Sequence, residues 1–559
     1  MSFQDPVSKC TTSIPGLGTL EGLQYANGVQ QFCGIPYADL PKRWTRSILK
    51  TSWNGGYHDG AHLGHDCPMP IVEGDNSNDL VPVPPSKHLP WPMAVDELSG
   101  LVMNIVIPHA CEVSSNQLPV FVYVHGGSLL YGGANLPIFD AVNFVSHSIS
   151  IGLPIICVNF NYRVGIGGFL ASNSIKLELQ KDGHAGNGNF GFTDQQVGFD
   201  WVQKYIAHLG GDPNNVTAVG ESAGGISISN QLHAMNPPVF HRAICMSGLS
   251  AAIPPWTQKQ HQILFEAVCS HFKIDPCAES ALEQLRAIPQ QDLANATPAI
   301  QGVPSGTGNP CLDGWFYHPD LDPRDVNIPP PWLKDYMFGD TYHEGIIFHL
   351  NLLDYDYEAI RDVLQSHILD EASTDKILSA YEITQDLSSV ELFRRVEHMC
   401  GDAIFKIPNY VLAHKSLDHR RSQEGGLFFY HFDQRSRLPN ALEGTAYHAH
   451  ELLYLFGNLD HELNENEQHM AREFKSAWIK FTYGLPPWQA DYQHHQCQWM
   501  VWGPDSCIKV KTEEEDQLTR DYVRMKMVLQ LGGGSTWKRW LTGVDSLVNR
   551  RWKLWSEGH

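Results

Sequence analysis

The sequence places a serine between two glycines in a pattern that is typical of a catalytic nucleophile. Ser222 lies in Gly220-Glu221-Ser222-Ala223-Gly224, directly after the apolar run 216–219 and directly before a helical pattern. A strand, a sharp turn and a helix in this order lift the serine hydroxyl above the edge of a sheet and point the positive end of the helix at it. A tight turn without chemistry is the alternative, since glycine and serine are common in turns.

A serine hydroxyl is a weak nucleophile and needs a base, which in turn needs an acid to orient it. In this architecture the chain order is serine, acid, histidine. Glu344 and Asp340 both follow a short apolar run downstream of Ser222, and spacing does not separate them. His448 and His450, in a segment after the apolar run 426–432, both qualify as the base.

The glycine-rich segment after the apolar run 118–124 is suited to stabilise an oxyanion. It reads His125-Gly126-Gly127-Ser128, and glycine lets backbone N–H groups approach a substrate oxygen closely. The N–H of Ala223 is expected to supply a donor from the other side. A simple glycine-rich turn is the alternative, and we interpret His125 as a packing residue of this loop.

Alternating strand and helix patterns must position these residues. Apolar runs at 118–124, 153–158 and 216–220 alternate with a helical stripe over 194–209, which is the pattern of a parallel sheet with crossover helices. Further strands are expected at 336–339 and 426–432, and a long helix at 513–531. An apolar stripe over 537–555 predicts a terminal helix docked on the body, with a dimer contact or a membrane-surface helix as alternatives.

Composition restricts the possible partners. The 559 residues are 42% hydrophobic and carry a net charge of −22, which allows a sizeable core and disfavours nucleic acid as a partner. No apolar window is long enough to span a membrane. The N-terminus lacks the pattern of a secretory signal, so a cytoplasmic protein is expected. The 12 cysteines include no CxxC pair; Cys269 and Cys277 are expected to be reduced, and the histidines and cysteine of 494–497 are interpreted as a surface loop without a metal.

Taken together, these motifs resemble the type-B carboxylesterase/lipase family, which includes cholinesterases and large fungal lipases. The resemblance covers about residues 32–488. Within the family, the chain resembles intracellular members of the fungal type. The resemblance rests on the elbow, on the run 188–217 that leads to it, and on segments that read FCGIPYA at 32–38, NYRVGIGGFL at 161–170 and LDG at 312–314.

The resemblance implies residue roles that spacing left open. It implies Glu344, which precedes a glycine, as the acid, and His448, nine residues before Gly457, as the base. It also implies an oxyanion hole and a substrate pocket, with these members: Gly126, Gly127, Ser128 and Ala223 for the hole, and Glu221 and Leu129 for the pocket. Cys67 matches a family disulfide position, but its partner is replaced by Gly100, which supports an intracellular protein. The chain after residue 488 has no clear match.

We therefore expect a single α/β-hydrolase domain over 1–559, with a largely helical region at 257–440 that caps an active-site gorge. The expected function is serine carboxylic-ester hydrolysis of a small or medium hydrophobic ester through an acyl-enzyme. It requires no cofactor and no metal, and the protein is a monomer or homodimer. A pathway-specific hydrolase or acyltransferase with the same triad is one alternative, and a non-catalytic interaction module is another. Four aromatic residues are candidate pocket lining, with core packing as the alternative: Trp315, Phe316, Tyr317 and Phe348.

Overall fold

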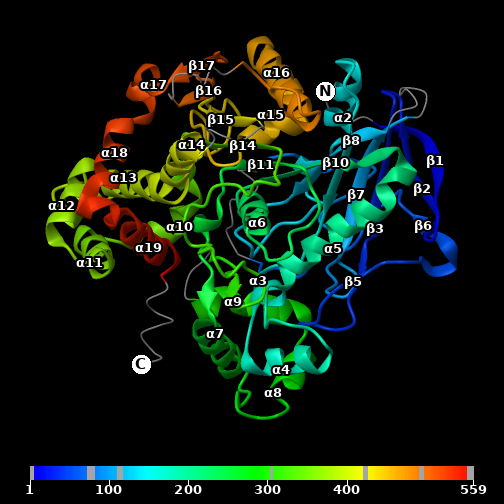
Figure 1. Cartoon of the computed structure of the whole chain (residues 1–559), viewed down its shortest axis with the longest axis horizontal. Helices are drawn as coiled ribbons and strands as arrows, with labels where there is room; N and C mark the ends of the chain where they lie inside the picture. Colours follow the sequence, from blue (N-terminus) through cyan, green and yellow to red (C-terminus); the bar gives the residue numbers. More distant parts are fainter. Residues whose placement is uncertain are drawn as a thin grey trace.

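A single large mixed sheet runs through the molecule (Figure 1). The computed structural model describes residues 5–71, 82–109, 117–301, 306–419, 426–489 and 497–550. Within these residues the strand order is β1 (Pro6–Ile14), β2 (Gly18–Tyr25), β3 (Val29–Pro36), β7 (Val102–Pro108), β9 (Ile156–Phe160), β8 (Leu118–Val124), β10 (Gly211–Glu221), β11 (Arg242–Met246), β14 (Asp335–Thr341), β15 (Leu427–Phe432), β16 (Gln498–Trp502) and β17 (Ile508–Thr512), with β6 (Tyr57–Asp59) beside β2.

The centre of the sheet is parallel and its two sides are antiparallel. All pairings from β9 through β8, β10, β11, β14 and β15 to β16 are parallel. The pairings along β1, β2, β3, β7 and β9, and that of β16 with β17, are antiparallel, and the short β6 joins β2 in parallel. Strand β8 is buried at every position, because both faces of a central parallel strand are covered. The α/β class with a mostly parallel sheet, predicted from the apolar runs, is confirmed.

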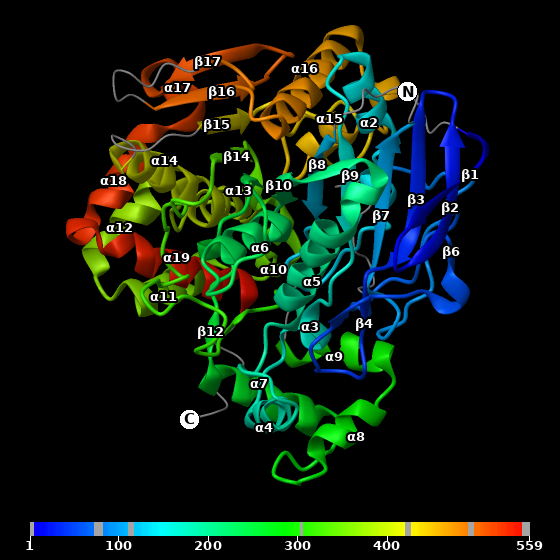
Figure 2. The same ribbon diagram turned by 45° about the vertical axis from the view of Figure 1, so that its right-hand side comes forward.

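Helices cover both faces of this sheet (Figure 2). Helices α5 (Phe190–Tyr205) and α6 (Ala223–Leu232) lie on one face, and α2 (Val142–Ser150) and α16 (Glu465–Thr482) lie on the other. Alternate side chains of β8 divide between the two cores: Val120 and Val122 join the first, and Phe121 and Tyr123 join the second. The helix predicted over 194–209 is present, but it begins at Phe190 and ends in the short η4 (Ile206–Leu209).

The helices of the region 257–440 form two blocks, with strand β14 between them in the chain (Figure 1). The first block contains α7 (Gln258–His271), α8 (Ala281–Ala287) and α9 (Gln290–Gln301). The second contains α10 (His349–Leu352), α11 (Tyr357–Ile368), α12 (Glu371–Ala380), α13 (Ser389–Gly401) and α14 (Ile407–His419). That these blocks cap a gorge within a single domain stays a prediction.

The C-terminal helical stretch differs from its sequence prediction. The single helix expected over 513–531 is wrong: α17 (Glu513–Arg520) and α18 (Tyr522–Gln530) are separated at Asp521, whose φ is 50°. Aspartate tolerates this left-handed conformation because its short side chain bonds locally, here by accepting from the N–H of Arg524 at 3.2 Å.

Helix α19 (Thr536–Asn549) docks on the body as predicted. Its apolar stripe, which includes Trp540, Val544 and Leu547, is buried against α11 and neighbouring helices. Residues 551–555 of the predicted stripe lie outside the described residues. Among the described helices, none has the length and the apolar character that crossing a bilayer requires.

Candidate active site

Ser222 occupies a strained turn between β10 and α6. Its backbone has φ 54° and ψ −125°, a conformation that L-residues rarely adopt. The flanking glycines make this turn possible: a Cβ on Gly220 would lie 2.3 Å from the carbonyl carbon of Gly224, and a Cβ on Gly224 would lie 2.0 Å from the oxygen of Val124. The segment has the strand–turn–helix geometry of a nucleophile elbow.

The predicted acid and base meet at the carboxyl ends of two neighbouring strands. Glu344 begins η6 (Glu344–Phe348) after β14, and His448 follows β15. The Nδ1 atom of His448 is hydrogen-bonded to Glu344 Oε2. Both side chains are buried, with exposed fractions of 3% for His448 and 1% for Glu344. A backbone hydrogen bond of 2.8 Å from the N–H of His343 to the oxygen of Ala446 joins the two segments.

Two donors hold the carboxylate of Glu344 in place. Its Oε1 accepts the hydroxyl of Ser247 at 2.7 Å and the N–H of Thr341 at 2.6 Å. Ser247 follows β11 and has φ 46°, so it is a second strained serine at this edge of the sheet. Sequence reasoning missed Ser247, as it missed the strand β11 that precedes it.

Asp340 and His450, the alternative acid and base, bind other partners. Asp340 Oδ1 accepts from Arg520 at 2.6 Å and is hydrogen-bonded to His431 at 2.8 Å. The negative charge of Asp340 is therefore paired with Arg520, and its Oδ1 is already used in hydrogen bonds. The Nδ1 of His450 is hydrogen-bonded to the oxygen of Gln434 at 3.0 Å, and its ring stacks on Tyr447. The structure therefore pairs Glu344 with His448 and gives both rivals other partners.

The outer nitrogen of the His448 ring lies next to the nucleophile elbow. Its Nε2 is 3.1 Å from Oε1 of Glu221, the residue that precedes Ser222. This contact lacks the angles of a hydrogen bond, and neither atom has a hydrogen-bond partner among the described residues. One side of the imidazole is thus fixed by Glu344, while the other remains available at the elbow.

Three buried carboxylates control the charge of this imidazole. Burial lowers the pKa of His448, but the negative charges of Glu221 and Glu344 outweigh it and raise the pKa to about 9. Burial raises the pKa of Glu221 to about 7, against the opposing effect of His448. Burial and the neighbouring carboxylates raise the pKa of Glu451 well above its ordinary value.

The glycine-rich segment packs directly on the elbow. A Cβ on Gly126 would lie 2.8 Å from the oxygen of Glu221 and 3.1 Å from the Cβ of Ser222, so only glycine fits there. Gly127, Ser128 and Leu129 have φ of 107°, 58° and 56°, a run of left-handed backbone that includes two residues with side chains. The predicted pocket residue Leu129 is fully buried in this structure.

His125 packs rather than reacts in this arrangement. Its ring stacks on Tyr162 with a centroid separation of 4.3 Å, and its Nδ1 is hydrogen-bonded to the oxygen of Gly126 at 2.9 Å. Burial lowers its pKa to about 4, which keeps the ring neutral. The prediction that His125 is a packing residue is consistent with this geometry.

An aromatic pair lies beside the base, and of its two members the sequence indicated only Phe348. The ring of Phe405 is 4.9 Å from His448 and stacks on Phe348 at 6.2 Å. Phe405 belongs to η7 (Asp402–Lys406), a π-helical turn, and no sequence periodicity signals such a turn. The other three candidate lining residues pack elsewhere: Phe316 against Phe192, Tyr317 onto Asn230, and Trp315 beneath Arg46.

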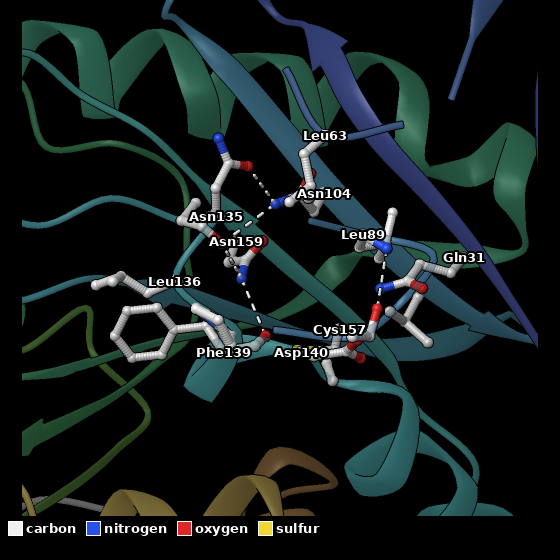
Figure 3. Close-up of a pocket in the computed structure, with 15 residues that line it drawn as sticks. Gln31, Leu63, Leu89, Asn104, Asn135, Leu136, Phe139, Asp140, Cys157 and Asn159 are labelled. Carbon is white, nitrogen blue, oxygen red and sulfur yellow. Dashed lines mark hydrogen bonds between the residues drawn. The ribbon is translucent and has the colours of Figure 1, made fainter. Parts of the chain in front are cut away.

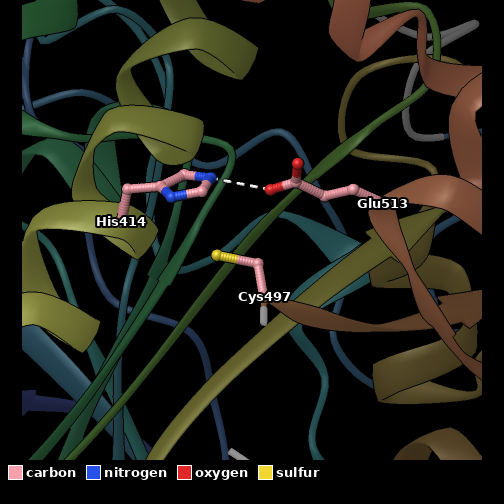
Figure 4. Close-up of side chains that lie close together, drawn as sticks. All are labelled: His414, Cys497 and Glu513. Atoms are coloured by element: carbon pink, nitrogen blue, oxygen red, sulfur yellow. Dashed lines mark hydrogen bonds and ion pairs between the residues drawn. The ribbon is translucent and has the colours of Figure 1, made fainter. Parts of the chain in front are cut away.

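A His–Cys–Glu cluster forms between α14, β16 and α17 (Figure 4). Cys497 is buried, so its interpretation as part of a surface loop is wrong; residues 494–496 lie outside the described residues. Glu513 already binds His414 Nε2 at 2.7 Å with one oxygen and Lys526 Nζ at 2.7 Å with the other. Burial raises the pKa of the Cys497 thiol and so disfavours the thiolate that a metal would need. We therefore describe the cluster as an ion-pair network.

A separate small pocket of about 30 Å³, lined by both polar and apolar side chains, lies between β7, β9 and the segment 134–141 (Figure 3). None of the predicted site residues lines it. Its amides bond to one another and to backbone: Asn104 donates to Asn135 at 3.2 Å, and Asn159 donates to the oxygen of Phe139 at 3.2 Å. These bonds cross-link the strands to the segment, which is a structural role.

The cysteines agree with the sequence expectation. Cys67 is a free, buried thiol that lies 3.6 Å from the oxygen of Gly100. A Cβ on Gly100 would lie 3.1 Å from the backbone nitrogen of Cys67, so position 100 is adjacent to Cys67. Cys269 and Cys277 are both free.

Comparison with known proteins agrees with this geometry. The model of the carboxylesterase family matches residues 7–526. Lipase 3 of Yarrowia lipolytica is 30% identical over 85% of this chain and 89% of its own length, and the para-nitrobenzyl esterase of Bacillus subtilis is 27% identical over 82% and 86%. A solved PNB esterase structure superposes with a TM-score of 0.71 at 23% identity, covering 93% of this chain and 99% of that chain, which shows the α/β fold. The chain belongs to the carboxylesterase family, whose members here are esterases and lipases.

Proposed function

We propose that this carboxylesterase hydrolyses esters through a triad of Ser222, His448 and Glu344. The observation that carries this proposal is the pairing of His448 Nδ1 with Glu344, which leaves Nε2 beside Glu221 at the elbow of Ser222, without a hydrogen-bond partner among the described residues. An imidazole that is hydrogen-bonded to a buried acid through one nitrogen, and whose other nitrogen makes no hydrogen bond, has the geometry that a general base requires.

In the proposed reaction, Ser222 attacks the ester carbonyl while His448 takes the hydroxyl proton. Glu344 keeps the imidazole in the correct tautomer and stabilises the imidazolium that forms. His448 then protonates the leaving alkoxide, and water repeats the cycle on the acyl-enzyme. Each step uses only side chains of this chain and water.

We propose that the N–H groups of Gly127, Ser128 and Ala223 receive the oxyanion, with Gly126 allowing the loop to approach. The support is the direct packing of Gly126 on Ser222 and the left-handed backbone of the loop. Loss of one such donor costs about 2.7–4 kcal/mol of transition-state stabilisation in related systems. The side chain of Ser128 is proposed to narrow the pocket.

We propose a small or medium hydrophobic ester as the substrate. The support is the stacked pair Phe348 and Phe405 beside His448, which offers an apolar surface next to the base. Glu221 and Leu129 are proposed to line the same pocket. The Yarrowia relative is named a lipase and the Bacillus relative an esterase, which favours ester substrates in general.

A panel of p-nitrophenyl esters of graded acyl length tests this proposal. We expect a maximum of kcat/KM at a short or medium chain, and no turnover above background in Ser222→Ala. Adding an alcohol tests the acyltransferase alternative, because a transferase would form the new ester in place of the free acid. A protein that hydrolyses none of these esters while it is folded would instead support the interaction module.

We also propose a cytoplasmic location. The support is Cys67, whose family partner is replaced by Gly100, together with the free state of the described cysteines. Fluorescence imaging of the protein tagged at its C-terminus tests this, and accumulation in the medium would contradict it.

A further inference from the structure

One buried guanidinium lies behind the two strand ends that carry the acid and the base. Arg520 is the last residue of α17 and is almost completely buried. It comes from the part of the chain for which the sequence offered no resemblance, and it lies 180 residues after Asp340. A fully buried arginine is rare unless its hydrogen bonds are used.

On the acid side, Arg520 holds the end of β14. Its Nη1 donates to Asp340 Oδ1 at 2.6 Å and to the backbone oxygen of Thr341 at 3.2 Å. The N–H of the same Thr341 donates to Glu344 Oε1 at 2.6 Å. The residue that orients the acid is therefore bound through its carbonyl by Arg520 and through its N–H by Glu344.

On the base side, Arg520 holds the end of β15. Its Nη2 donates to Asp433 Oδ1, and Asp433 directly follows this strand, at the start of the segment that leads to His448. The N–H of Asp433 donates to the oxygen of Trp502 at 2.7 Å, so this residue is also fixed to β16. One planar side chain thus bridges both strand ends.

The surrounding charges keep this bridge ionised. Burial raises the pKa of Asp340, but His431 and Arg520 outweigh it and hold the pKa below its ordinary value. Burial lowers the pKa of Arg520, but the negative charges of Asp433 and Asp340 outweigh burial and raise this pKa. Other neighbours complete the network: Asn409 donates to Asp340 at 3.0 Å, Tyr522 bonds to His431 at 3.0 Å, and Lys511 pairs with Asp516 at 3.0 Å.

We propose that Arg520 is a positioning residue for ester hydrolysis, which sets the spacing between the strand ends that carry Glu344 and His448. The inference rests on the proposed triad. Because a misplacement of about 1 Å in a catalytic group costs up to ~10²-fold in rate, loosening the bridge should slow the chemical step rather than weaken substrate binding.

The test is Arg520→Lys, which keeps the positive charge but replaces the two nitrogens that bind Asp340 and Asp433 separately with a single one. We expect kcat to fall by about 10- to 100-fold while KM changes by less than about threefold. The pH profile should also change: with Glu344 less well held, the apparent pKa of His448 should fall, and the acidic limb of kcat/KM should move to lower pH.

Arg242→Lys is the matched control. Arg242 pairs with Asp335 at 2.8 Å at the opposite end of β14, so its loss weakens the same strand away from the site. We expect kcat of this variant to stay within about twofold of the native value, even where its melting temperature falls as far as that of Arg520→Lys.

Asp433→Asn provides an independent variant in case Arg520→Lys does not fold. It removes one charge on the base side only, and we expect a kcat loss of about 5- to 20-fold with the same shift in the pH profile. An unchanged kcat in the folded Arg520 or Asp433 variants would overturn the proposal, as would equal losses in Arg242→Lys. If the native protein hydrolyses no ester, the proposed function itself fails, so the two failures are distinguishable.

Discussion

The two edges of the central sheet are built differently. At the edge where the parallel strands begin, glycines adopt the left-handed backbone conformation. Examples are Gly152 before β9 and Gly210 before β10, with φ of 72° and 87°. At the edge where the strands end, serine and leucine adopt such angles, as at Ser128, Leu129 and Ser222. A side chain in this conformation is costly, so it persists where a function requires that side chain or its N–H in place.

Buried charge follows the same division. The ion pair of Arg242 with Asp335, where strands begin, is partly exposed. Where strands end, Glu344, Glu221 and Arg520 are almost completely buried. Strain and desolvated charge are therefore concentrated at one edge of the sheet, which is where sites of open α/β sheets are found. The predictions below test whether that concentration serves chemistry.

The largest effect is expected for Ser222→Ala. Removing the nucleophile should lower kcat by ~10⁴–10⁶-fold without unfolding the protein, because the φ of the residue is set by the glycines around it. Turnover of p-nitrophenyl butyrate and circular dichroism measure the two properties. Near-native turnover in this variant would contradict the claim that the strained backbone at this edge serves catalysis.

Glu344→Gln should have the next largest effect. The amide keeps the size of the side chain but offers an N–H or a neutral oxygen to His448 Nδ1, so the imidazole adopts the wrong tautomer or loses its stabilisation. We expect kcat to fall by about 10³- to 10⁴-fold with little change in KM. Asp340→Asn is the comparison: if it lost as much activity through kcat alone while folded, the acid would be misassigned.

Glu221→Gln should shift the pH dependence. The base must be neutral to accept the serine proton, so kcat/KM should rise with pH through the pKa of His448, which lies at about 9. The negative charge of Glu221 contributes to that raised value, and its removal should lower the apparent pKa by about one unit. Activity below neutral pH would then increase relative to the maximum. A profile that does not move, or moves to higher pH, would show that Glu221 does not act on the base.

The smallest expected effects are changes in stability, and they compare the two edges of the sheet directly. Ser128→Gly should relieve left-handed strain and stabilise the protein by about 0.5–1 kcal/mol after the entropy cost of glycine. Gly210→Ala, where a Cβ meets no atom within 4 Å, should destabilise it by about 1 kcal/mol through strain alone. Denaturant midpoints measure both, and shifts of the same sign would contradict the difference between the edges.

Local patterns predicted most of the scaffold. The apolar run 118–124 coincides with β8, and the elbow lies where strand and helix patterns meet, because buried parallel strands leave a continuous apolar signature. The break at Asp521 could not be predicted from helical periodicity, which continues through it; only the backbone reveals that an aspartate adopts φ 50°.

The site was only partly accessible from the sequence. Residue types and chain order left Asp340 beside Glu344 and His450 beside His448, because each pair falls in the same short segment and only side-chain direction separates its members. The resemblance to carboxylesterases favoured Glu344 and His448, and the structure pairs these two. Ser247, Phe405 and Arg520 had no signal, since their proximity depends on strands and helices that are distant in the chain.

The most direct test of the account is covalent labelling with a fluorophosphonate, followed by mass mapping of the modified peptide. The account predicts one phosphonyl group on Ser222 of the native protein, and labelling at least about 10³-fold slower in folded His448→Gln. A label on another residue, no label at all, or undiminished labelling in His448→Gln would contradict the claim that the imidazole activates this hydroxyl.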